Sequence, residues 1–497
     1  MIVCAAVARV GWAAWIAHAE PSAVRDPDTP GYLAPARALV EVGRFSITPT
    51  DPIPMFIRTP GYPVFLGSIL WLTGSEWAIS VLQSIVSLVA VAAVVWVLRR
   101  LIGMATALIA GAIVAIDPLQ FVASGTLLTE SLTAVVLAAT VAVGAVVFAV
   151  RHPAQVPPAA VFALGVLAAT AAMVRPTFWF YPAVIVVLLV GRFRRLPRRA
   201  LAMQLAVFLL PVAAVVGGWQ LRNQSQVGSW QMSGAQSIVL YCDDAARVEA
   251  DLSGEPLDSV EDRFGCPFEE DDLNTDCERR GGWTCWVPDP AAAGQGFDEL
   301  GREGREILVD HPVQTARVLA TGLAREVAGP GTDTVAHYLD IHPSPALTGG
   351  LFVWNALVCA FAAWGAVAGL RSPHRAFWAF VVATVAYAML VSAGAAAYAR
   401  FRTPVVPLLA LLAAVGVRDC VQRLRRRARP EDDLASRQRT SSGRRVRWDT
   451  SRPASTNSSV PPHTGSSCST DRTPSKPPSY MASTRRTQST WPRPGTR

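Results

Sequence analysis

Two aspartates in the segment RDPDTPGY, residues 25–32, are the first candidates for chemistry. Asp26 and Asp28 follow the first apolar stretch of a chain in which 51% of the residues are hydrophobic. A carboxylate at the edge of apolar surroundings has its pKa shifted by desolvation, by a metal or by a nearby Arg, and can then act as a base. Asp28, followed by Thr29 and Pro30, equally suits the start of a helix as its N-cap. Both interpretations stay open at this point.

Further charged residues stand at the ends of apolar segments, where charges are costly and therefore become functional candidates. Arg58 precedes a Pro-Gly-Tyr-Pro turn in FIRTPGYPVFL, and Arg175 precedes a proline and three aromatic residues in MVRPTFWFYP. The guanidinium group suits bidentate binding of a phosphate, although a lone interfacial Arg also anchors a helix at lipid headgroups. The other candidates are Glu130 in LLTESL, Arg222 in GGWQLRNQ, and Arg400 and Arg402 in AYARFRTP.

Apolar segments of membrane-spanning length must position these residues, and they predict an all-α polytopic membrane protein. We interpret the N-terminal apolar stretch as a retained first span, because a basic n-region and a clear cleavage site are missing. The stretch 61–74 is too short to span comfortably and is expected to be interfacial or re-entrant. About ten transmembrane helices are predicted, near residues 1–17, 77–98, 102–116, 126–150, 158–174, 177–190, 201–219, 350–370, 376–397 and 404–418.

The distribution of charge predicts the orientation of these helices. With the N-terminus in the cytoplasm, every strongly basic connection falls on the cytoplasmic side, as the positive-inside rule requires. Residues 241–310 carry 20 Asp and Glu against 6 Arg, whereas residues 421–497 carry 17 Lys and Arg against 5 Asp and Glu. Acidic and basic segments are therefore expected on opposite sides of the membrane, which disfavours nucleic-acid binding as the explanation of the high isoelectric point. The candidate site residues all fall on the outer face.

The same pattern divides the chain into four parts. Residues 1–222 form an N-terminal transmembrane module with a first external loop at 18–76, and 223–349 form an acidic external lobe. Residues 350–420 form the C-terminal transmembrane helices, and 421–497 a basic cytoplasmic tail expected to be disordered. The centre of the external lobe is expected to be rich in loops. Its cysteines lack zinc-site spacing and predict one or two disulfides: Cys242, Cys266, Cys277 and Cys285.

The order of these motifs resembles the bacterial GT-C glycosyltransferases, in the branch of the protein O-mannosyltransferases and aminoarabinose transferases. The motifs are D-x-D followed by Tyr, then R-x-P-G-Y-P-x-F-L, T-E-S-L, R-P with aromatic residues, W-x-x-R-N and R-F-R-x-P-x-x-P. They cover residues 26–230 and 398–407, and the ordered set is more specific than any single piece. The resemblance implies a GT-C-like bundle with an external lobe, in the cytoplasmic membrane of a bacterium, with both termini cytoplasmic.

The resemblance also implies an activity. A sugar would move from a polyprenyl-phosphate donor to a hydroxyl of a glycan, lipid or protein acceptor on the outer face of the membrane. Asp28 would be the catalytic base and Asp26 a supporting acid. Arg58, with Arg400 and Arg402, would bind the donor phosphate. Tyr32, Glu130, Arg175 and Arg222 would support this site.

The chain departs from the aminoarabinose branch just before Pro60. That branch carries Glu-Lys-Pro-Pro there, whereas this chain has Ile57-Arg58-Thr59-Pro60. The missing Glu is a possible metal ligand, so the resemblance establishes no cofactor and leaves dependence on a divalent metal open. The segment HYLDIH offers His337, Asp340 and His342 as ligands, or merely as ordinary loop residues.

Two other functions compete with glycosyl transfer. A transporter or flippase of polyprenyl-linked glycans also needs Arg at the bilayer edge, but it should carry charges near mid-membrane in repeated halves. A non-catalytic membrane scaffold that presents the acidic lobe is the second alternative. The sequence contains no Gly-rich phosphate loop, which disfavours a nucleotide-sugar donor. Neither the sugar nor the acceptor follows from the sequence.

Overall fold

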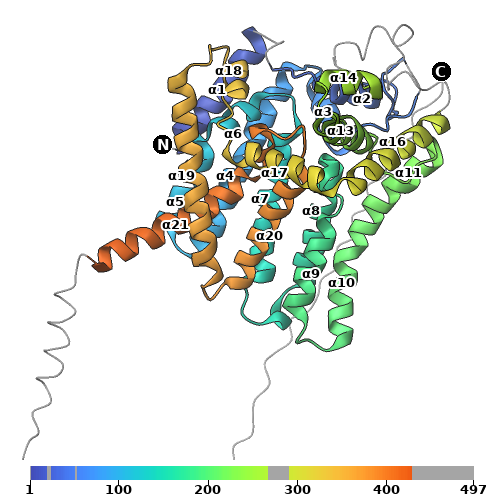
Figure 1. The fold of residues 1–497 in the computed structure, drawn as a ribbon. Helices are drawn as coiled ribbons and strands as arrows, with labels where there is room; N and C mark the ends of the chain where they lie inside the picture. The colour runs from blue at the N-terminus through green and yellow to red at the C-terminus, as the bar shows by residue number, and fades with distance from the viewer. Residues whose placement is uncertain (1, 20–23, 51–52, 267–289, 428–497) are drawn as a thin grey trace, which may run out of the picture. The chain divides into compact units, whose positions relative to one another are not determined.

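The computed structural model describes residues 2–19, 24–50, 53–266 and 290–427, which belong to one compact unit, Met1–Pro430 (Figure 1). No strand forms among these residues, and an isolated antiparallel bridge joins Ser46 and Pro54. The all-helical prediction is therefore confirmed for the described part of the chain. Cys277, Cys285 and residues 428–497 of the predicted tail lie outside the described residues.

Helices long and apolar enough to cross a membrane account for most of the predicted spans. Seven helices within the described ranges meet this criterion, or eight if the pair α5 and α6, bent by 57°, forms one span. The seven are α4 (Trp77–Leu101), α7 (Thr129–Phe148), η2 (Pro176–Phe178) with α9 (Tyr181–Phe193), α10 (Arg198–Val212) continued by η3 (Ala213–Gly217) and α11 (Gly218–Val227), α19 (Pro345–Leu370), α20 (Arg375–Ser392), and η7 (Ala399–Val405) with α21 (Val406–Arg427). The bent pair is α5 (Met104–Ile116) and α6 (Pro118–Gly125).

The remaining apolar helices are shorter. They are α1 (Ile2–Ala19), α3 (Gly61–Thr73) and α8 (Pro158–Val174). Helices α1 and α8 correspond to the other two predicted spans, and α3 to the segment predicted to be interfacial. At the other end of the chain, α21 continues to Arg427. Residues 421–427 are therefore helical, which corrects the prediction that the disordered tail begins at residue 421.

Close helix packing builds the centre of the bundle. Helices α7 and α21 are the most enclosed of the spans, because 72% of the apolar window of each is buried. Helix α19 lies against α21 where Gly365 faces Gly416, and a Cβ on Gly365 would come within 1.8 Å of the Leu412 carbonyl oxygen. Only a residue without a side chain permits this backbone approach, which is typical of helix contacts in membranes.

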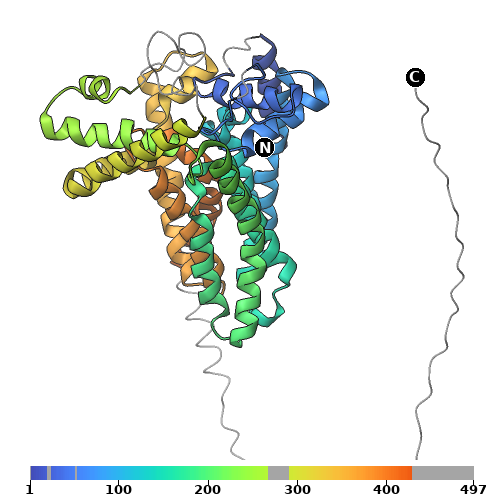
Figure 2. The same ribbon diagram turned by 90° about the vertical axis from the view of Figure 1, so that its right-hand side faces the viewer.

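One end of the bundle carries the helices of the first external loop and of the external lobe (Figures 1 and 2). Helix α2 (Thr29–Glu41) packs against α3. The lobe contains α12 (Ala235–Ile238), η4 (Val239–Ala245), α13 (Ala246–Ser253), α14 (Leu257–Phe264), α16 (Pro290–Asp310), α17 (Pro312–Ala328) and α18 (Thr332–Leu339).

The centre of the lobe is helical as far as it is described, which corrects the expectation of loops. The reason is that apolar residues recur at helical spacing among the many acidic residues. On α14, Leu257, Val260 and Phe264 fall on one face and pack against Ala246 and Ala250 of α13. Two short amphipathic helices thus bury their apolar faces against each other.

A disulfide joins Cys242 of η4 to Cys266, 24 residues later, and confirms that the lobe cysteines form at least one disulfide. The crosslink encloses α13 and α14. Exchange of both cysteines for Ser should lower the free energy of unfolding by about 3 kcal/mol, since the unfolded chain loses a loop constraint of this size. Thermal unfolding of the detergent-purified protein measures this effect. The matched control is Cys4→Ser, which changes an exposed free thiol, and equal melting of all three proteins would contradict the prediction.

Candidate active site

Six charged side chains from distant parts of the chain meet at the end of the bundle that carries the lobe. Two come from the segment before α2, one from the segment before α3, one from the first turn of α7, one from the junction of α8 and η2, and one from η7. We call this group the charged cluster: Asp26, Asp28, Arg58, Glu130, Arg175 and Arg400. The sequence predicts all six as site residues.

Asp28 is held by two arginines. Its Oδ1 lies 2.5 Å from a terminal nitrogen of Arg58, and its Oδ2 lies 3.4 Å from one of Arg400. Asp28 occupies the N-cap position of α2, but its side chain makes no capping hydrogen bond. The helix-cap interpretation is therefore right about the position and wrong about the role of the carboxylate.

Tyr32 and Gly31 shape the environment of Arg58. The guanidinium carbon of Arg58 lies 4.6 Å from the centre of the Tyr32 ring, a cation–π distance, and Arg58 donates a 3.3 Å hydrogen bond to the Tyr32 hydroxyl. Burial raises the pKa of Tyr32 in spite of the adjacent Arg58, so this hydroxyl remains protonated. A Cβ on Gly31 would lie 3.1 Å from Nε of Arg58, so glycine leaves the guanidinium its space.

Asp26 accepts hydrogen bonds from two side chains and from the backbone. Its Oδ2 accepts a 2.6 Å hydrogen bond from Arg400 and another from the hydroxyl of Tyr338 on α18. Its Oδ1 accepts from the backbone N–H of Asp28 at 3.3 Å. Burial and the carboxylate of Asp26 raise the pKa of Tyr338, which keeps that hydroxyl a donor. Asp26 therefore fixes the positions of Arg400 and of the Asp28 backbone.

Glu130 is the most buried carboxylate of the charged cluster. Its Oε1 lies 3.4 Å from Nε of Arg400 and 3.6 Å from a terminal nitrogen of Arg175. Its Oε2 is buried and has no hydrogen-bond partner among the residues that the structure describes. The aromatic ring of Phe401 lies beside both arginines, 5.0 Å from Arg175 and 5.9 Å from Arg400. Two arginines thus compensate one desolvated carboxylate, as buried charges require.

The Pro-Gly-Tyr-Pro motif brings Arg58 to this cluster by close packing. A Cβ on Gly61 would lie 2.5 Å from the backbone of Met173 near the end of α8, two residues before Arg175. Tyr62 then lies edge-on to Tyr32, with 5.2 Å between the ring centres, and donates its hydroxyl hydrogen to Gln83. The start of α3 is thereby fixed between α8 and α2.

Two predicted arginines do not belong to the cluster. Arg402 was expected to bind the donor phosphate, but it donates to the backbone carbonyls of Glu326, Val327 and Gly329 at 2.6–3.2 Å. It caps the C-terminal end of α17, so the structure does not bring Arg402 into the charged cluster, and its binding of the donor phosphate stays a prediction. Arg222 donates to backbone carbonyls of the first external loop and holds that loop against α11, which is a structural role.

The segment with His337, Asp340 and His342 contributes Tyr338 to the cluster instead of metal ligands. Within the described residues, no group of three His, Cys, Asp or Glu side chains is placed to hold a metal ion. The carboxylates of the charged cluster are already paired with arginines, so we assign no chemical step to a metal. Tyr338 was missed by the sequence analysis, although it lies inside the motif considered there.

The external lobe holds the turn that precedes Arg400. Asp244 of η4 accepts a 2.7 Å hydrogen bond from the backbone N–H of Ala395, and Arg325 of α17 donates to the Ala395 carbonyl at 2.6 Å. Ala395 stands five residues before Arg400. The lobe therefore takes part in positioning the cluster.

The neighbouring Asp243 makes the stability of the lobe depend on pH. Burial, with the charges of Asp244 and Glu261, raises the pKa of Asp243 to about 7. The folded state then binds the proton more tightly than the unfolded state, so this contribution to stability is lost as the pH rises from about 4 through about 7. Asp243→Asn should therefore stabilise the protein by about 2 kcal/mol at pH 8 and hardly at pH 4. Thermal unfolding at both pH values measures this difference, with the exposed Asp310→Asn as control. A pH-independent effect would contradict the prediction.

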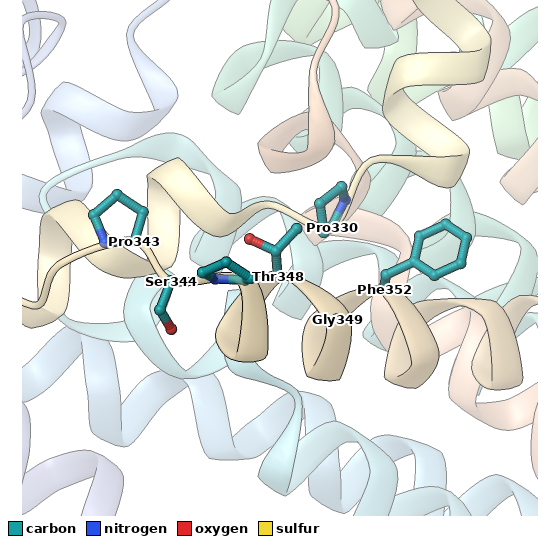
Figure 3. A pocket seen from close by; sticks show the side chains of 7 residues that line it. Pro330, Pro343, Ser344, Thr348, Gly349 and Phe352 are labelled. Atoms are coloured by element: carbon teal, nitrogen blue, oxygen red, sulfur yellow. The ribbon is translucent and has the colours of Figure 1, made fainter.

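A shallow surface pocket of about 640 Å³ lies beside the start of α19 (Figure 3). Its walls are largely proline and aromatic carbon, from Pro330, Pro343, Pro345 and Phe352. No member of the charged cluster lines it, and we assign it no part in the site.

Comparison with known proteins gives matches among solved structures alone. No protein-family profile matches the chain, and no curated protein sequence matches it. The oligosaccharyltransferase AglB from Archaeoglobus fulgidus, solved with an inhibitory peptide and a dolichol-phosphate, is similar over 90% of this chain and 52% of its own, with 12% identity and a TM-score of 0.45. ArnT from Cupriavidus metallidurans bound to undecaprenyl phosphate is similar over 84% of this chain and 77% of its own, with 14% identity and a TM-score of 0.37.

AglB and ArnT are both GT-C glycosyltransferases, the class that the ordered motifs resemble. The chain spans about half the length of the oligosaccharyltransferase. Because the TM-scores are below 0.5, we derive the function from the residues of the site and not from these structures.

Proposed function

We propose that the chain is a membrane glycosyltransferase that moves a sugar from a polyprenyl-phosphate donor to an acceptor hydroxyl. The observation that carries this proposal is Asp28, a carboxylate at the end of the helix bundle that carries the lobe, held between Arg58 and Arg400. A base beside two guanidinium groups is what displacement of a phosphate by a hydroxyl requires. The donor's sugar and the acceptor are left open.

Each member of the site has a role in this reaction. Asp28 takes the proton of the acceptor hydroxyl as that oxygen attacks the anomeric carbon. The bond between the anomeric carbon and the phosphate oxygen breaks, which inverts the configuration. Arg58 and Arg400 stabilise the charge that develops on the leaving phosphate. Asp26, with Tyr338, holds Arg400 in place.

The location of the site supports chemistry at the outer face of a bacterial cytoplasmic membrane. The cluster lies at the end of the bundle that also carries the acidic, disulfide-linked lobe, and disulfides are typical of oxidising compartments. The basic connections 191–199 and 371–375 lie at the opposite ends of their helices, as expected for cytoplasmic loops. We place both termini in the cytoplasm for the same reason.

The charge distribution favours transfer over transport. Across the described residues, the paired charges of the site gather at one end of the bundle, whereas a transporter site is expected near the midplane between repeats. Whether transfer requires a divalent metal can be tested with EDTA. Because arginines already neutralise the carboxylates of the charged cluster, we expect transfer to continue in its presence.

Mass spectrometry of envelope glycans tests the proposed function. Cells with the intact gene are compared with cells that lack it and with cells that carry Asp28→Asn. We expect one glycan, glycolipid or glycoprotein to lose a sugar both in the deletion and in the variant. An unchanged profile in the deletion strain, under conditions where the intact protein is present, would contradict the proposal.

A further inference from the structure

Arg58 and Arg400 differ in how firmly the rest of the cluster holds them. Arg400 is buried and is paired with Asp26 and Glu130 in addition to Asp28. Arg58 pairs with Asp28 at 2.5 Å and also contacts Tyr32, but its side chain is 19% exposed against 10% for Arg400, so its guanidinium is the more accessible to a ligand. The Arg58 guanidinium is therefore the one that can change partners while Arg400 stays in place.

The charges of the cluster are balanced without a substrate. Three carboxylates face three arginines among the described residues. A phosphate that enters this partly buried site adds negative charge with no additional cation to compensate it, and such charges are costly when unpaired. Transfer adds no further net charge to the site if one carboxylate becomes neutral as the phosphate gains a negative charge.

We propose that Arg58 passes from Asp28 to the leaving phosphate during transfer. This inference rests on the proposed function and describes how its charges are handled. The acceptor hydroxyl gives its proton to Asp28 and its oxygen forms the new bond to the anomeric carbon. The phosphodiester of the donor loses that carbon and becomes a phosphomonoester with one more negative charge. Asp28 has lost one negative charge in the same step, so the total charge of the site is unchanged.

The exchange has a consequence for binding that does not require knowledge of the sugar. A phosphomonoester resembles the product and competes with the ionised Asp28 for Arg58. Asp28→Asn imitates the neutral, protonated carboxyl and releases Arg58 for the phosphate. The variant should therefore bind a polyprenyl monophosphate more tightly than the natural protein does, although it cannot catalyse transfer.

A double-mutant cycle with farnesyl phosphate tests the exchange. The full-length protein and the variants Asp28→Asn, Arg58→Gln and the double variant are compared in zwitterionic nanodiscs at pH 8 by calorimetry. We expect Asp28→Asn to tighten binding about fivefold and Arg58→Gln to weaken it about tenfold. In the Arg58→Gln background, Asp28→Asn should change the affinity by less than about twofold. Asp333→Asn, an exposed carboxylate on α18, is the matched control and should leave the affinity unchanged.

Two results would overturn the exchange and are distinguishable from each other. If Asp28→Asn tightens binding equally with and without Arg58, Asp28 acts by simple repulsion and the exchange is wrong, while the proposed function stands. If the natural protein does not bind farnesyl phosphate and Arg58→Gln makes no difference, the donor site itself is wrong. Thermal unfolding of each variant verifies its fold, and Asp28→Ser replaces Asp28→Asn if the latter does not fold.

Discussion

Asp28→Asn is expected to reduce the rate of sugar transfer by about 10³-fold, because a positioned general base contributes two to four orders of magnitude. Asn preserves the size of the side chain but cannot accept the proton. The fold should be retained, because Asp26 and Glu130 continue to pair with Arg400. The initial rate of release of polyprenyl phosphate from its sugar-linked form measures the loss, and thermal unfolding verifies the fold.

Tyr338→Phe is the matched control for Asp28→Asn. It removes a hydroxyl from Asp26, in the same cluster, but leaves the proposed base intact. We expect a rate reduction of about tenfold or less, since one hydrogen bond to a charged group contributes about 1.5 kcal/mol. Equal losses in both variants would show that Asp28 has a structural role and is not the base.

Arg400→Gln is expected to produce the largest loss of stability of any single substitution in the site. The side chain is buried and pairs with three carboxylates, Asp26, Asp28 and Glu130. Removal of one partner from a buried ion pair costs about 3–5 kcal/mol because a desolvated charge is left uncompensated. Thermal unfolding should therefore show a marked decrease in the melting temperature, together with loss of binding to farnesyl phosphate.

A second substitution separates this charge effect from a loss of packing. Glu130→Gln in the Arg400→Gln background neutralises the most buried of the three carboxylates that lose Arg400, which then keeps only Arg175 as a partner within the described part of the chain. It should therefore restore part of the melting temperature without restoring binding. A melting temperature of Arg400→Gln equal to that of the natural protein would contradict the prediction. No rescue by Glu130→Gln would assign the loss to packing.

The sequence predicts the members of the charged cluster because each stands next to a recognisable structural signal. Arg58 stands two residues before Pro60, Arg175 stands directly before Pro176, and Glu130 lies in the first turn of a span. The positive-inside rule then places these ends on one face of the membrane. What the sequence cannot supply is the pairing, since Arg400 meets Asp26 across more than 370 residues.

The separation of Arg402 from the charged cluster has a physical reason. Arg400 and Arg402 are two positions apart on η7, a 3₁₀ helix with three residues per turn, so their side chains point in directions about 120° apart. Sequence proximity suggested one shared role, but the geometry of the helix separates them. The contact of Tyr338 with Asp26 was missed for the opposite reason, because α18 offers no local pattern that points to a partner 312 residues away.

In the external lobe, amino-acid composition alone led to a wrong prediction of secondary structure. Its high density of acidic residues suggested loops, whereas an apolar face of only three residues is enough to pack α14 on α13. The cysteines were easier to interpret, because four of them in one polar external segment predict crosslinking without specifying the pairs.

Turnover by the purified protein is the most direct test of the central claim. The natural protein and Asp28→Asn are incubated with the pool of polyprenyl-phosphate sugars extracted from the same cells, together with membranes from the deletion strain as the source of acceptor. Mass spectrometry follows the lipid carriers over time. We predict that the natural protein converts one sugar-linked carrier to free polyprenyl phosphate, with the sugar appearing on an acceptor, and that Asp28→Asn does neither. Conversion at the same rate by both proteins, or by neither, would contradict the account.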